Sequence, residues 1–328
     1  MKKKLTFITA MCIAVCGIAG CGNNQPAATT TAATAAPAAT EATTTAAETT
    51  APETEATEAV TTAIPSPEVE GTVLYDSDGV KITYKGFRYC DEYDGGAMLE
   101  LGFGNNTGEE LHITPYETSI NKRMYQVEPI IIKPDGTFEI GSTIIDIPAG
   151  EITDTYGLYL AAVPDMDYTL DNIGETSFSF EIMVGDDWEH AVNTELYTVE
   201  NPDVTEYSID YDDSGEVVYD KDDIKIVVCG TDFDSIFWGS TVKLYVYNGS
   251  DRSINISVPT VSLNGEEHEC FAYLTVAPDC HLYDELLFDN SLDVQPLKTF
   301  TAVFEIEEFN TWNNGELIDT SDPVTVEF

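Results

Sequence analysis

Two pairs of closely spaced aspartates come nearest, by type and spacing, to a site that could do chemistry. Asp76 and Asp78 form one pair, and Asp220 and Asp222 form the other. Carboxylate oxygens are the ligands that Ca²⁺ prefers, so these four residues are candidate metal ligands. Neither segment follows the twelve-residue EF-hand loop with Gly at position 6 and Glu at position 12. Aspartate also caps turns without any metal, so we expect no resident cofactor and keep calcium as the alternative.

Three tryptophans are the candidate ligand-binding residues. Trp188 and Trp312 stand at equivalent places after a repeated Phe-Glu-Ile segment, and Trp238 stands in a separate loop segment. Exposed aromatic rings among Asn and Asp can stack on a sugar or a peptide. The alternative is that each ring closes the open end of its own domain.

Catalytic motifs carry little weight in this chain. Ser119-Ile-Asn-Lys122 fits S-x-x-K, but that acyl-transfer chemistry needs both residues on one helical turn, and here a strand-end turn is expected. Glu266-Glu-His-Glu has the wrong order for a zincin helix. We expect no enzyme. An envelope hydrolase with paired carboxylates is the last alternative, because some acids will always lie at a suitable distance.

The N-terminal segment predicts where in the cell the protein is located. Lys2, Lys3 and Lys4 precede an apolar run, Leu5–Gly17, and then Ile18-Ala-Gly-Cys21. A basic start, a short apolar run and small residues at the cut are typical of a secretory signal peptide. Residues 1–20 resemble a bacterial lipoprotein signal with its lipobox. The resemblance implies a diacylglycerol with fatty acyl chains such as palmitate on Cys21, and a lipid anchor at the outer face of the cell membrane.

Residues 21–70 are composed mainly of Ala, Thr, Pro and Glu. Such a segment cannot bury enough apolar surface to offset its ordering entropy. We expect a disordered tether, which resembles the Thr-rich tethers of Gram-positive surface lipoproteins. A helix over its Ala-rich part is the alternative, although Thr and Pro oppose it.

The remaining chain contains an internal repeat. Gly71–Ile82 recurs as Gly215–Ile226 at an offset of 144 residues, whereas Phe180-Glu-Ile recurs as Phe304-Glu-Ile at an offset of 124. The falling offset predicts an insertion in the first copy, around Gln126–Glu139. We therefore expect two domains, a first repeat over 71–203 and a second repeat over 204–328, with a hinge near 201–214.

Strict apolar–polar alternation predicts strands in both repeats. Phe178, Phe180 and Ile182 alternate with Ser177, Ser179 and Glu181. Such runs, separated by Asn-Gly and Asp-Gly turns, favour half-buried antiparallel strands. The expected fold is all-β, with two tandem immunoglobulin-like antiparallel β-sandwiches. Short helical turns are expected only at Asp167–Ile173 and Asp284–Asn290.

The repeated Tyr-Asp-x-Asp-x-Ile-Lys-Ile pattern and the Ser-Leu-Asn-Gly turn resemble modules of poorly characterised surface lipoproteins from Clostridia-type Firmicutes. The resemblance implies tandem immunoglobulin-like domains on a lipidated tether. It implies no reaction.

The charge balance restricts the partners. Without residues 1–20 the chain has 11 Lys plus Arg against 59 Asp plus Glu, which gives −48. Seven of these acids lie in the tether, so the part after residue 70 carries −41. Nucleic acid is disfavoured because its phosphates would be repelled. We expect a non-enzymatic binding or envelope-assembly protein, whose partners are the membrane through the anchor and an extracellular glycan, peptide or envelope protein. The alternative is a calcium-stabilised adhesion or capture protein.

Cysteine spacing supports no zinc or thioredoxin-like motif. A bridge between Cys270 and Cys280 is conceivable in an oxidising location.

Overall fold

Strands make up most of the regular structure in the described part of the computed structural model. The structure describes residues 64–90, 96–125, 127–133, 137–160, 170–208, 211–234, 239–272, 274–289, 291–294, 296–309, 311 and 315–328. The helices within these ranges are two 3-10 turns, η1 (Trp188–His190) and η2 (Ser291–Asp293), and neither could cross a membrane. The all-β prediction is confirmed. Cys21, residues 1–20 and most of the tether lie outside the described residues.

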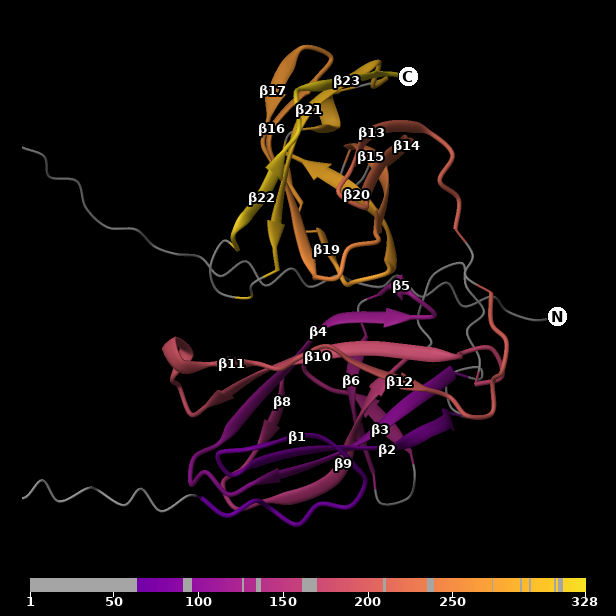
Figure 1. Cartoon of the computed structure of the whole chain (residues 1–328). Helices are drawn as coiled ribbons and strands as arrows, with labels where there is room; N and C mark the ends of the chain where they lie inside the picture. The colour runs from indigo at the N-terminus through magenta and orange to yellow at the C-terminus, as the bar shows by residue number, and fades with distance from the viewer. Residues whose placement is uncertain are drawn as a thin grey trace, which may run out of the picture. The chain divides into compact units, whose positions relative to one another are not determined.

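The first repeat forms two sheets (Figure 1). Its strands are β1 (Thr72–Ser77), β2 (Val80–Cys90), β3 (Gly96–Asn105), β4 (Leu111–Ile120), β5 (Arg123–Met124), β6 (Glu128–Ile132), β7 (Phe138–Ile140), β8 (Ile145–Ile147), β9 (Ile152–Tyr159), β10 (Glu175–Val184), β11 (Val192–Asn193) and β12 (Tyr197–Glu200). One sheet has the order β1-β2-β3-β9-β6-β7. In the other, β8 and β10 flank β4, and β11 and β12 both pair with β10.

The second repeat has a closely similar arrangement. Its strands are β13 (Glu216–Lys221), β14 (Ile224–Asp234), β15 (Gly239–Asn248), β16 (Ile254–Leu263), β17 (Glu266–His268), β18 (Cys270–Phe271), β19 (Leu274–Val276), β20 (Cys280–Phe288), β21 (Thr299–Glu308), β22 (Leu317–Thr320) and β23 (Val324–Glu327). Strands β13-β14-β15-β20 lie in one sheet, which the β20–β5 pairing joins to the β4–β10 sheet of the first repeat, and β18 also pairs with β20. Strands β17-β16-β21-β22 form the other, with β19 on β16 and β23 on β21. The helical turn expected at Asp284–Asn290 is wrong, because the chain up to Phe288 continues β20.

The two repeats differ by an inserted hairpin. Leu111 pairs with Ile147 in the first repeat, and Ile254 pairs with Val276 at the equivalent place in the second. The offset between the copies therefore falls from 143 to 129 residues between these strands. The extra residues form the β6–β7 hairpin, and no described strand of the second repeat corresponds to β7. The insertion lies where the sequence offsets predicted it.

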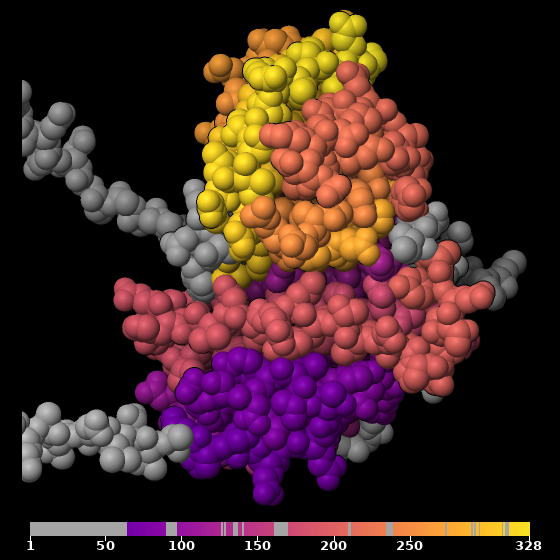
Figure 2. All heavy atoms as spheres, in the orientation of Figure 1, coloured from indigo at the N-terminus to yellow at the C-terminus, as the bar shows by residue number. Residues whose placement is uncertain are grey.

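Each repeat has its own core because alternate residues of its strands face the opposite sheet. Phe103, Phe178 and Phe180 are fully buried in the first core, and Phe300 and Phe304 are fully buried in the second. Figure 2 shows the heavy atoms of both repeats as spheres, from indigo at the start of the first repeat to yellow at the end of the second.

The last residues of the expected tether contact the first repeat. Pro67 and Val69 lie so close to β3 that a Cβ on Gly104 would come within 2.5 Å of Pro67 and 2.7 Å of Val69. The Asn106 side-chain amide donates a hydrogen bond to the carbonyl of Pro65 at 2.9 Å. The part of the chain held by the first repeat thus begins by Pro65, a few residues before the expected boundary at 70.

Candidate functional site

A two-residue strand of the first repeat reaches the second repeat. Arg123 in β5 pairs in parallel with His281 in β20, and the His281 N–H donates to the Lys122 carbonyl at 2.8 Å. The Lys122 ammonium forms an ion pair with Asp279. This hydrogen bond raises the pKa of Lys122 and lowers the pKa of Asp279. The β4–β5 turn is therefore a junction between the repeats.

Met124 anchors this junction. Its side chain is 9% exposed and belongs to the core of the second repeat, although the residue lies in a strand of the first. The Ala277 N–H points at its sulfur, 3.4 Å away. The first repeat thus supplies a side chain that completes the core of its neighbour.

An aromatic stack holds the segment that was expected to be a hinge. Tyr211 and Tyr247 each stack on the His281 ring, with centroids 4.8 and 4.7 Å away. The Tyr245 hydroxyl lies 2.8 Å from His281 Nδ1. Burial lowers the pKa of His281, so the neutral ring is favoured. Residue 211, at least, is fixed against the second repeat.

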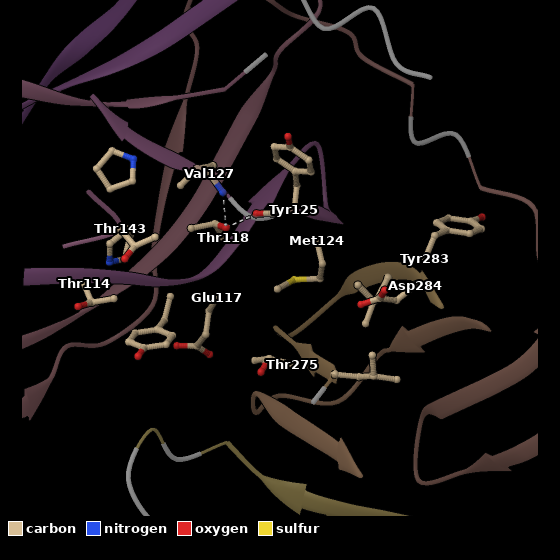
Figure 3. Close-up of a pocket in the computed structure, with 15 residues that line it drawn as sticks. Thr114, Glu117, Thr118, Met124, Tyr125, Val127, Thr143, Thr275, Tyr283 and Asp284 are labelled. Atoms are coloured by element: carbon tan, nitrogen blue, oxygen red, sulfur yellow. Dashed lines mark hydrogen bonds between the residues drawn. The ribbon is translucent and has the colours of Figure 1, made fainter. Parts of the chain in front are cut away.

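A cavity of about 560 Å³ lies beside Met124 (Figure 3). Its walls come from β4 and the chain after it in the first repeat, and from β19 and β20 in the second. The lining combines hydroxyls, apolar side chains and two carboxylates; its residues are Thr114, Pro115, Tyr116, Glu117, Thr118, Met124, Tyr125, Val127, Pro129, Thr143, Leu274, Thr275, Leu282, Tyr283 and Asp284. This size is typical of a small-ligand site.

Asp284 is the most unusual residue of this lining. By strand alternation it shares a face of β20 with Leu282 and Leu286, which are core residues. Its carboxylate opens onto the cavity and so keeps exposed surface, but the surrounding protein atoms raise its pKa. It accepts a hydrogen bond from the Glu285 N–H at 2.7 Å. Among the described residues no Lys, Arg or His forms an ion pair with it.

Glu117 supplies the second carboxylate, from the opposite wall. It lies in a β-bulge of β4 with φ of 50°, where the register against β10 shifts. Its carboxylate accepts a hydrogen bond from the Ser179 hydroxyl at 2.5 Å. The bulge aims an acidic side chain at the cavity, as bulges commonly re-aim side chains. Together, the two carboxylates suit a cationic group.

The predicted metal ligands lie in and beside the two turns that join β1 to β2 and β13 to β14. Asp76 pairs with Lys81 at 3.4 Å, and Asp78 has a turn φ of 49°. Asp222 has a turn φ of 53°, and Asp220 lies beside it in β13. No group of three or more His, Cys, Asp or Glu side chains is placed to hold a metal ion in the part of the chain that is described.

Two of the three candidate tryptophans cannot be placed. Trp188 lies in η1 and is 48% exposed. Trp238 and Trp312 lie outside the described residues, as does the lipidation residue Cys21.

The conceivable bridge between Cys270 and Cys280 is wrong. Both thiols are free, because Cys270 pairs through its backbone with Phe288 while Cys280 lies at the opposite end of β20. Burial raises the pKa of both thiols, to about 12 and about 11, so neither is a ready nucleophile.

Sequence reasoning missed both cavity carboxylates. Asp284 stands in Leu282-Tyr-Asp-Glu-Leu286, where the apolar alternation is broken at an inward position. That break was the signal available for Asp284. Glu117 had no local signal, because its bulge depends on pairing with β10.

Comparisons with known proteins add little. No family model matches the chain, and no curated protein matches it. Among solved structures, the chain is similar to the YadV chaperone, with 12% identity, a TM-score of 0.23 and coverage of 75% of this chain and 99% of that one. It is also similar to the CupB2 chaperone of Pseudomonas aeruginosa, with 11% identity, a TM-score of 0.20 and coverage of 70% and 91%.

Proposed function

We propose that this chain is a lipid-anchored bacterial surface protein whose two immunoglobulin-like β-sandwiches form a non-enzymatic binding site at their junction. The cavity of about 560 Å³, lined by both repeats, is the observation that carries the proposal. A spacer has no need of a carboxylate that faces a cavity and has no basic partner among the described residues, as is the case for Asp284.

The strand order supports the immunoglobulin-like assignment. In each repeat three strands of one sheet, β2-β3-β9 or β14-β15-β20, stand opposite a sheet built on a central pair, β4-β10 or β16-β21. With the flanking strands β1 and β8, or β13 and β19, each repeat has at least the seven strands that are typical of that sandwich. The anchor rests on the lipobox resemblance of residues 18–21.

Two experiments test the proposal. Labelling of growing cells with a fatty-acid analogue should mark the protein, and Cys21→Ala should abolish the label and release the protein from the membrane. Arrays of glycans and peptides should then give ligands whose binding to the mature chain is weakened by Glu117→Gln. The proposal is refuted if Cys21→Ala keeps the label and Glu117→Gln keeps the binding. Cleavage of a bound glycan would favour the hydrolase alternative.

A second candidate is glycan capture by the tryptophans. The 48% exposure of Trp188 favours it, because the exposed part of an indole ring can stack on a sugar. Binding that is lost in Trp188→Ala but kept in Glu117→Gln would support this candidate instead.

A further inference from the structure

One edge of β20 is open along the cavity. On one side this strand pairs with β15 from Cys280 to Leu286. On the other side β5 pairs only with His281, and β18 pairs only with Leu287 and Phe288. No strand of the described part of the chain covers residues 282–286. At about 3.3 Å per residue, the open edge is about 17 Å long.

The first repeat fills the corresponding edge. There β9 pairs with β6 across four residues, from Tyr156 to Tyr159. The insertion that created the β6–β7 hairpin thus belongs to the repeat whose edge is covered. The second repeat has the same sheet without that cover.

The open edge presents backbone groups that can bind another strand. The His281 N–H points to this side, toward the Lys122 carbonyl, so Tyr283 and Glu285 direct their backbone groups the same way. The Glu285 N–H already donates to the Asp284 carboxylate at 2.7 Å. Tyr283 and the Glu285 carbonyl remain for an added strand.

We infer that this edge binds an extended segment of a partner protein by strand addition, and that a Lys or Arg of the segment enters the cavity between Glu117 and Asp284. The inference rests on the proposed binding function and names its ligand class. Strand addition uses backbone hydrogen bonds for affinity and side-chain pockets for specificity. The cavity lining has two carboxylates and no basic side chain, and its apolar members can take the methylene stem of a basic residue.

Charge favours a separate partner protein, and not a segment of this chain, as the ligand of the open edge. Residues 22–63 contain five glutamates and no Lys or Arg, so the tether offers the cavity no cation. The edge strand of the inserted hairpin, Phe138-Glu-Ile140, is also without a basic residue, which disfavours a second copy. A net charge of −41 after residue 70 attracts a basic segment at long range.

A competing explanation for the carboxylate at position 284 is that it protects the open edge of β20 from unwanted strand pairing. Inward-pointing charges on edge strands discourage unwanted pairing. A purely protective Asp284 predicts that no peptide binds at this edge, and that removing its charge makes the protein self-associate.

The test uses random twelve-residue peptides displayed on phage and selected at low salt on residues 22–328, which are the mature chain without Cys21. Enriched peptides should contain Lys or Arg within a β-prone segment. For synthetic copies, Asp284→Asn or Glu117→Gln should weaken binding about 10- to 100-fold, as expected for a lost charge-assisted hydrogen bond. Methylation of alternate peptide amides should weaken it at least about tenfold, and bound peptide should protect the Tyr283 amide from hydrogen exchange.

Glu216→Gln is the matched control. Glu216 is exposed on β13, at the far edge of the same sheet, and its replacement changes the charge equally. Peptides that bind but are insensitive to Asp284→Asn, Glu117→Gln and amide methylation would overturn the inference and leave the proposed binding function standing. Failure to enrich any peptide would overturn the inference, while ligands from the glycan array could still support the function.

Discussion

Met124→Ala tests whether the two repeats share a core. The Met124 side chain is 9% exposed within the second core, and truncation of a buried Met to Ala destabilises proteins by about 2–5 kcal/mol. Because Met124 also lines an open cavity, water can enter the space it leaves, so we expect the lower part of that range. The Ala277 N–H would lose its sulfur acceptor as well. We expect a loss of about 2–3 kcal/mol in the free energy of unfolding.

For a folded part of this size, that loss corresponds to a fall of about 4–12 °C in the melting temperature of the affected repeat. Calorimetry would measure the melt, and hydrogen exchange would locate it. Amide protection should fall at Leu244 and Phe304 in the second repeat and remain at Phe180 in the first. The matched control is Met98→Ala, which removes the same side chain from a buried site in the first repeat. If Met124→Ala leaves the second repeat unchanged, or weakens only the first, the shared core is refuted.

The remaining predictions concern the tether, acidity and calcium. Gly104→Val should displace residues 65–69 and speed proteolysis there, because a Cβ would lie 2.5 Å from Pro67; unchanged cleavage would contradict this contact. The folded-state pKa of His281 is lowered, so its contribution to stability is complete above its unfolded value of about 6.5 and declines as the pH falls below it. Chemical denaturation at pH 7 and pH 5 should therefore show a smaller loss for His281→Gln than for the parent chain, and equal losses would contradict it. Calcium and magnesium should raise the melting temperature equally or not at all, since Asp76 has a lysine partner and no three-ligand cluster forms in the described ranges; a calcium-specific rise of several degrees would restore the metal hypothesis.

Local periodicity was sufficient to predict the strands. In β10, Phe178, Phe180 and Ile182 are buried in the core as their alternation with polar residues required. The repeat offsets likewise located the β6–β7 insertion. The alternation is a reliable signal because neighbouring residues in a strand face two different environments, whichever strand they pair with. The prediction of a helical turn at Asp284–Asn290 was wrong, because the pairing of β20 with β15 outweighs the local preference of a short acidic segment.

The candidate site could not be predicted in the same way, because it depends on pairing between distant segments. Nothing near Met124 in the sequence indicates that its side chain enters a core built from residues that begin with Tyr219. Glu117 faces the cavity only because β4 bulges against β10. Only Asp284 can be recognised from the sequence, because it is a polar residue at an inward position between two leucines.

The comparison of the repeats carries the functional argument further than either repeat alone. Duplicated sheets should have the same exposed edges. Because an open edge can pair with another chain, proteins usually cover it or protect it with charges. The first repeat covers its β9 edge with β6, whereas the second leaves five residues of β20 open beside a cavity. The acid at this edge, Asp284, corresponds to Tyr156 in the first repeat, which packs edge-on against Phe103. An aromatic contact in one copy thus corresponds to a charged cavity wall in the other, at an edge that the described strands leave open. The tyrosine contributes a packing contact that the aspartate lacks, and the inferred binding of a basic segment would account for this difference.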